Sequence, residues 1–340
     1  MRSLAIMGSG MVTGVGLSAP ATCAAIRCAI DNFNETRFID EGGEWIIGSE
    51  VPLDEAWREF EKLVQMAASA IRECHAHAGA VPISSVPLLL CIAEPTRPGR
   101  AYGLDNELLK EIEKSLNTKL HPRSAVIARG RASIAEALHL ASHLITPECP
   151  FAMIAGVDSF LSWSTLSVYE SQSRLLTSKN SNGFIPGEAA AAVLIGAPNA
   201  GAENLICTGI GAGQEPATVE SEMPLRGNGM VEAFRQAFAD AGCTMADMDY
   251  RLTDLNGEQY SFKEAALAMN RLVRVRKARF PIWHPTDCVG EIGAAIGPLA
   301  LGVALTAARK SYAPGPGVLC HFGEGSDRIA LVLRHQGRAA

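Results

Sequence analysis

The chain has 340 residues and a formal net charge of −6, with 48% apolar and 19% charged residues. This balance is typical of a globular protein with a large buried core and excludes a disordered chain. The one basic cluster, within residues 271–279, fits the polar face of a helix and the loop after it, so we expect no nucleic-acid partner.

Short apolar runs alternate with amphipathic segments along the first part of the chain. Residues 3–7 form an apolar run closed by Gly8-Ser9-Gly10, which predicts a buried strand followed by a turn. Similar runs predict strands, and helical spacing predicts helices between them. The expected strands are 86–92, 125–128, 151–155 and 189–195, and the expected helices are 20–30, 57–78, 104–117 and 132–145.

The same pattern begins again after the turn-forming stretch at residues 198–201. Expected strands cover 205–210, 251–255, 318–322 and 329–334, and expected helices cover 229–241, 262–273 and 293–308. Strands that alternate with helices indicate an α/β fold with helix-covered sheets. Two such series predict two similar halves, residues 1–199 and 200–340, although no sequence repeat relates them.

Nine cysteines are scattered along the chain without disulfide-framework or zinc-site spacing. Such cysteines are typical of reduced thiols, so we expect a cytoplasmic location. Glycines interrupt the apolar start of the chain, which argues against a signal peptide, and no apolar run is long enough to span a membrane. Metal motifs, P-loops and dinucleotide fingerprints are lacking, so the sequence predicts neither a metal nor a cofactor.

Four stretches follow one another in an order that is specific when they are taken together. They are residues 6–13 (IMGSGMVT), 155–159 with 183–190 (AGVDS and GFIPGEAA), 290–295 (GEIGAA), and 322–326 with 329–333 (FGEGS and IALVL). Together they resemble the opening strand, the GF-x-x-GE-x-A segment, the GAAG helix start and the FGFGGTN turn of β-ketoacyl synthases, members of the thiolase superfamily. The resemblance implies a thiolase-like fold, two pseudo-symmetric halves in five αβαβα layers, and a homodimer.

The catalytic positions of that family are replaced in this chain. The synthases carry a nucleophilic cysteine where a strand ends and a buried helix starts, and the matching stretch, residues 125–137, places Ile127 there. The family's first histidine is matched by Asn256, and its second falls at Gly290, in a window (286–292) that contains no histidine. Glu324 replaces the aromatic residue that gates the acyl pocket.

A carboxylate that faces an apolar tunnel costs several kcal/mol unless it is paired. Arg129 lies beside the lost nucleophile in the sequence. We therefore hypothesise an Arg129–Glu324 ion pair, with the old acyl site closed or turned polar.

The retained scaffold and lost chemistry together predict a protein-binding adaptor or chaperone, for example for a secreted effector of bacterial type VI secretion. Two alternatives stay open. One is a chain-length-factor-like partner of an active synthase. The other is an acyl-transferring or condensing enzyme with a relocated nucleophile, for which Cys288 with His284 and Asp287 is the candidate. A loop cysteine near a solvated histidine explains the same cluster without any chemistry.

Overall fold

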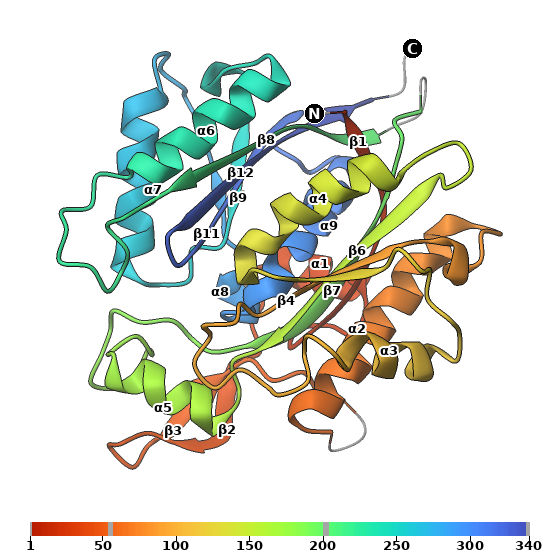
Figure 1. The fold of residues 1–340 in the computed structure, drawn as a ribbon. Coiled ribbons are helices and arrows are strands. Elements are labelled where there is room, and N and C mark those ends of the chain that lie inside the picture. Colours follow the sequence, from red (N-terminus) through yellow and green to blue (C-terminus); the bar gives the residue numbers. More distant parts are fainter. Residues whose placement is uncertain (1, 54–56, 200–203, 338–340) are drawn as a thin grey trace.

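A large sheet with helices on its faces forms the body of the protein (Figure 1). The computed structural model describes residues 2–53, 57–199 and 204–337. The strands of the large sheet are β1 (Leu4–Thr13), β4 (Leu88–Ile92), β5 (Ala125–Ala128), β6 (Phe151–Ser159), β7 (Glu188–Gly196), β8 (Asn204–Gln214), β9 (Tyr250–Thr253), β10 (Ile282–Trp283), β11 (Gly317–Glu324) and β12 (Asp327–Gln336). A separate two-stranded ribbon is made of β2 (Asn34–Ile39) and β3 (Trp45–Gly48).

The helices confirm most of the expected helical segments, with ends that differ by a few residues. They are α1 (Ala19–Arg27), α2 (Glu59–His75), α3 (Leu108–Leu116), α4 (Ser133–Leu144), α5 (Trp163–Ser171), α6 (Asn228–Ala241), α7 (Gln259–Leu272), α8 (Thr286–Val289) and α9 (Ile296–Arg309). Short 3₁₀ turns cover Ala76–Ala78, Ile83–Ser85, Gly130–Ala132, Met245–Asp247 and Gly293–Ala295. No helix in the described part of the chain could cross a bilayer, because none is both long and apolar enough.

The two halves of the large sheet share one strand order. The order is β1-β7-β6-β4-β5 in the first half and β8-β12-β11-β9-β10 in the second. In each half the first two neighbouring pairs are antiparallel and the last two are parallel. The halves join where β1 pairs with β8. The division expected between residues 199 and 200 falls between β7 and β8.

Helices separate and cover the two half-sheets in five layers. In β4, Leu88 and Leu90 pack in one core with α2 and α3, while Leu89 points to a second core that contains residues of α4 and α9. In β12, Leu331 joins that central core and Val332 packs with α6 and α7 instead. Because side chains alternate across a strand, each half-sheet has one outer helix layer and shares the central one. This is the expected αβαβα stack.

Strand β1 continues through the glycines that were expected to end it. Residues 4–13 form one strand, so the predicted turn at Gly8-Ser9-Gly10 is wrong. A Cβ atom at Gly10 would collide with the backbone carbonyl of Ala70 in α2, and one at Gly211 in β8 with that of Ala233 in α6. These glycines allow a helix to lie against the strand at both matching places.

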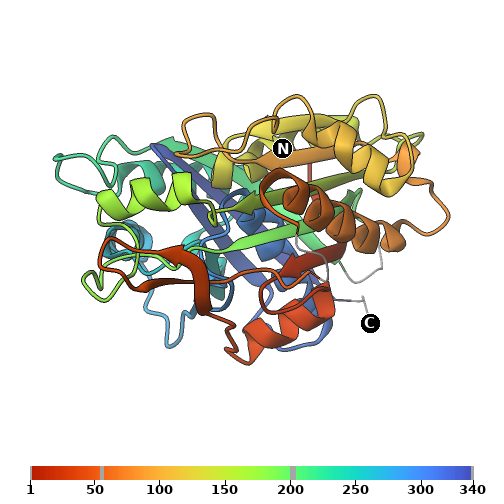
Figure 2. The same cartoon turned by 90° about the horizontal axis from the view of Figure 1, so that it is seen from below.

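The ribbon and α5 form a small unit that the sequence did not predict. Figure 2 shows the red-brown ribbon beside the yellow-green helix α5. Ile46 of the ribbon packs in an aromatic cluster with Phe160, Tyr169 and Phe184. Strands of only six and four residues give a weak periodic signal, so this unit was missed.

Candidate functional site

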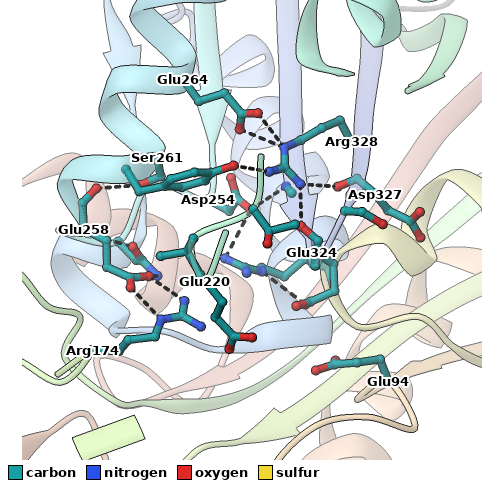
Figure 3. A pocket seen from close by; sticks show the side chains of 18 of the residues that line it. Glu94, Arg174, Glu220, Asp254, Glu258, Ser261, Glu264, Glu324, Asp327 and Arg328 are labelled. Carbon is teal, nitrogen blue, oxygen red and sulfur yellow. Dashed lines mark hydrogen bonds and ion pairs between the residues drawn. The ribbon is translucent and has the colours of Figure 1, made fainter. Parts of the chain in front are cut away.

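A pocket of about 790 Å³ opens where the parallel strands of both halves end (Figure 3). Strands β5, β9 and β11 end at Ala128, Thr253 and Glu324, and the residues just past β5 and β9 line it. In α/β sheets, ligands bind outside the carboxyl ends of the strands, particularly where the connectivity changes. Both halves therefore contribute to one hollow.

Arg131 lies at the start of the central helix layer and connects the two halves. It follows Gly130, which has a left-handed φ of 52°, and lies in the 3₁₀ turn that leads into α4. Its Nε is 3.2 Å from Glu324 Oε2, and its Nη1 is 3.3 Å from Glu291 Oε2 and 3.5 Å from Asp254 Oδ2. Burial lowers the pKa of Arg131, but the surrounding carboxylates outweigh it and hold that pKa well above the ordinary value.

Asn256 and Glu291 complete this side of the pocket. Asn256 Nδ2 donates to Glu291 Oε2 at 2.6 Å. The other oxygen of Glu291 accepts from the backbone N–H of Gly293 at 2.9 Å. The Glu291 carboxylate is almost completely buried and is held by hydrogen bonds on both oxygens.

Arg97 forms a second cationic centre behind the same pocket. Its Nε and Nη2 donate to the two oxygens of Glu94 at 2.8 and 2.9 Å, and Nη1 donates to Asp158 at 3.3 Å. Its Nη2 lies 3.7 Å from Glu324. The guanidinium also lies over the ring of Phe160. Glu324 is therefore shared between the buried Arg97 and the largely buried Arg131.

Carboxylates outnumber arginines in this network. The two buried arginines are surrounded by Glu94, Asp158, Asp254, Glu291 and Glu324. Burial raises the pKa of Asp254 to about 6, and burial with the neighbouring Glu324 carboxylate raises that of Glu94. Burial also raises the pKa of Glu324, but Arg131 and Arg97 outweigh it and keep that pKa below the ordinary value. The pocket is thus strongly polar, and burial favours the protonated forms of Asp254 and Glu94.

Comparison with known proteins gives matches to solved structures alone. No protein-family model matches the chain, and no curated protein does. A type II polyketide synthase acyl-carrier protein in complex with its ketosynthase matches with 14% identity over 98% of this chain and 99% of that chain, at a TM-score of 0.78. The ishigamide ketosynthase/chain length factor matches with 16% identity over 99% and 100%, at 0.76. A ketosynthase in complex with its chain length factor from Xenorhabdus doucetiae matches with 13% identity over 98% of each chain, at 0.74.

The chain has the thiolase-like fold of the ketosynthases. The expected fold class is therefore confirmed. Identities of 13–16% show the fold alone, so the chemistry of this ketosynthase-like chain depends on its own pocket.

The structure brings two of the four expected positions into the pocket. Asn256 and Glu324 line it. Ile127 lies within β5 and packs in the central core, and Gly290 has no side chain to offer and a φ of 71°. The side chains that meet Asn256 and Glu324 are those of Glu291 and Arg131.

Arg131 and Glu291 were missed by the sequence comparison. The sequence comparison was anchored on Gly130 and on residues 134–137, and it placed the nucleophile position at Ile127, four residues before Arg131. Gly130 was already used in that comparison, and its left-handed backbone, which precedes Arg131 at the helix start, is a property of the structure. For Glu291, the signal was a lone carboxylate inside an apolar, glycine-rich stretch.

The hypothesised Arg129–Glu324 ion pair is wrong. Arg129 is half exposed, and its guanidinium lies 2.6 Å from Asp327 and 3.5 Å from Glu136. Glu324 is paired with Arg131 and Arg97 instead. The physical reason is position, because Arg129 follows the strand end at the rim whereas Arg131 enters the helix that lies between the halves.

Cys288 does not line the pocket. It lies in α8 with its side chain in the central core, and burial raises the pKa of its thiol to about 11. His284 Nδ1 lies 2.7 Å from Asp287 Oδ2, and no hydrogen bond links His284 to Cys288 in the described part of the chain. The thiolate, which is the reactive form of cysteine, is therefore disfavoured at this position.

Replacing Arg131 should destabilise the protein far more than replacing Arg129. Arg131→Met leaves three buried carboxylates without their shared cation, so we expect a loss of about 3 to 5 kcal/mol in the free energy of unfolding. Arg129→Met is the matched control, and loss of its half-exposed pairs should cost about 1 kcal/mol or less. Urea unfolding of the two variants measures both values. Equal losses would contradict the described network.

Asp254 should make the protein less stable as the pH rises. Its folded-state pKa of about 6 lies above the unfolded value of roughly 3.9, so folding takes up protons between these values. This contribution is absent below about pH 4 and lowers stability by roughly 2 to 3 kcal/mol above about pH 7. The difference in unfolding free energy between Asp254→Asn and the native chain should therefore favour the variant more at about pH 8 than at about pH 4.

The pH dependence has a control in an exposed carboxylate. A hydrogen bond from Arg100 lowers the pKa of Asp105. Asp105→Asn should therefore be less stable relative to the native chain at about pH 8 than at about pH 4. Thermal or urea unfolding across the pH range gives both curves. An Asp254→Asn curve parallel to that of the native chain would show that Asp254 titrates as it does in the unfolded state.

Proposed function

We propose that this protein is a non-condensing protein of the ketosynthase fold that acts by binding another protein. The observation that carries the proposal is the contact of Arg131 with Glu291, which in turn contacts Asn256. Arg131 begins the buried helix, as a ketosynthase nucleophile does. Asn256 and Glu291 lie in the two segments in which the family's histidines are expected.

Residues of these three types cannot perform the condensing reaction. An arginine forms no thioester, so no acyl group can be held at this helix start. Asn256 can donate a hydrogen bond but cannot become an imidazolium, and Glu291 places a carboxyl group in the segment where the family has a histidine donor. The pocket therefore lacks the covalent carrier of a synthase, and its two arginines are already paired with carboxylates.

The same pocket is unsuitable for an acyl chain. Its interior holds several charged side chains, among them Asp254, Glu324 and Arg131. An acyl chain that entered the pocket would separate these charged groups from one another and could not replace their partners. Unpaired buried charges are costly. This polarity favours an adaptor or chaperone over a partner that measures acyl-chain length.

The proposed partner is a protein in the cytoplasm, and a secreted effector of a type VI secretion system remains the leading candidate. All nine cysteines are free thiols, which supports a reducing compartment. A chain-length-factor-like role is the second candidate. It is favoured by the ketosynthase and chain length factor pairs among the structural neighbours and is opposed by the polar pocket.

An edge of the large sheet supports association between chains. Strand β5 is the last strand on its side, and in the described part of the chain only β4 pairs with it. An unpaired strand edge is a template for pairing with another chain. We propose that it serves a homodimer or a heterodimer with a ketosynthase-like partner, and sedimentation of the purified chain measures which mass is present.

Incubation with acyl-thioester donors tests the non-condensing assignment. We expect intact-mass spectra without a stable acyl adduct, while an active β-ketoacyl synthase treated in parallel acquires one. An adduct that disappears in Cys288→Ala would overturn the proposal and establish a relocated nucleophile. The identity of neighbouring genes separates the remaining roles, since they should encode an effector, an acyl carrier protein or an active synthase.

A further inference from the structure

The ribbon formed by β2 and β3 has one face with partly exposed apolar side chains. Ile39, Trp45 and Ile47 are 42%, 48% and 37% exposed. Ile39 pairs directly with Trp45 across the two strands, and Ile47 follows Trp45 at the two-residue spacing that returns to the same face. Three large apolar side chains therefore form one patch on the outside of the molecule.

The opposite face of the ribbon is already used by the fold. Thr36 and Ile46 are buried, and Ile46 packs in the aromatic cluster with Phe160 and Phe184. A two-stranded ribbon has only two faces, and in the described part of the chain no element covers the second one. Large apolar residues gathered on an exposed face are typical of an interaction surface, whereas apolar residues scattered singly need no explanation.

Unpaired acidic residues surround the patch. Glu35 lies opposite Ile47, and Glu41 and Glu44 flank the turn that joins the strands. None of these three exposed side chains pairs with a cation in the part of the chain that the structure describes. The one arginine of the ribbon, Arg37, is 3.3 Å from Glu50. The patch is therefore apolar at its centre and has three unpaired carboxylates around it, while the Lys179 ammonium lies beside Gly42 at the turn.

We propose that this ribbon face is the docking surface for the partner, and that it binds an amphipathic segment whose apolar side chains are flanked by lysines or arginines. This inference rests on the proposed function, because it names the surface through which the protein binds. Trp45 would be the central anchor, since tryptophan is enriched among residues that dominate binding energy. The acidic residues would steer and select a basic partner, so binding weakens as salt rises.

A second copy of the chain is the competing occupant. Residues 271–279 alternate apolar and basic side chains, and Val275 among them is 60% exposed. This segment could meet the ribbon of another molecule. Such a contact joins two different surfaces, so it would produce rings or open chains of molecules. Self-association through the ribbon is therefore a distinguishable outcome.

The test uses the full chain and a fluorescent peptide made only of leucine and lysine with an amphipathic pattern. We expect binding that weakens with salt, and at least about tenfold weaker binding by the double variant Trp45→Thr/Ile47→Thr. Threonine keeps the strand propensity of both positions. Tyr102→Ser is the matched control, because Tyr102 is 90% exposed outside the ribbon and its loss should leave affinity unchanged.

The charge of the surface is tested separately. Glu41→Gln/Glu44→Gln should weaken binding and reduce its salt dependence, and a leucine–glutamate peptide should not bind. The inference fails if the Thr double variant, with an unchanged circular dichroism spectrum, binds the basic peptide as the native chain does. It also fails if the native chain forms oligomers that this variant abolishes. Neither failure affects the non-condensing assignment, which depends on the acyl-adduct measurement.

Discussion

One carboxylate, that of Glu324, is bound by two arginines from the other half of the chain, the buried Arg97 and the largely buried Arg131. Arg97 and Arg131 belong to the first half, and Glu324 ends a strand of the second. Removing one partner from a largely buried ion network leaves charges that are incompletely solvated, so each residue of the network requires the others. The polarity of the pocket and the closeness of the halves both depend on this pairing.

The fold brings these charges together through the carboxyl ends of its strands. Asp254 follows β9, Glu324 ends β11, and Arg131 enters the helix that follows β5. Asn256 and Glu291 then approach from loops of the second half. Acyl chemistry at this place would require a nucleophile and a dry apolar channel, and the chain provides a guanidinium and carboxylates.

Much of the fold could be predicted from local patterns, since strands such as β4 and β5 are unbroken apolar runs and α2 has clear helical spacing. Prediction failed where a residue type is required by a contact with a segment that is distant in the sequence. The glycines of β1 look like a turn in the sequence, but they are needed because α2 lies against the strand. The ribbon was missed because its inner residues are buried only by α5 and its neighbours.

The site was predicted in part for the same reason. Asn256 and Glu324 were found because each replaces one residue inside a recognisable motif. Whether Arg129 or Arg131 meets Glu324 depends on the left-handed backbone at Gly130 and on the packing of the two halves, which no local pattern records. Pairings of this kind converge in space and leave little trace in sequence spacing.

The central claim is that Arg131, and not Ile127, occupies the helix start that faces the pocket. Alkylation of two cysteine variants tests it most directly, with peptide mapping to separate the new thiol from the native ones. The account predicts that iodoacetamide modifies Arg131→Cys in the folded protein, at a rate that rises with pH because the neighbouring carboxylates disfavour the thiolate, and that Ile127→Cys is protected, since its side chain would lie in the central core. Rapid modification at position 127 with protection at position 131 would contradict it.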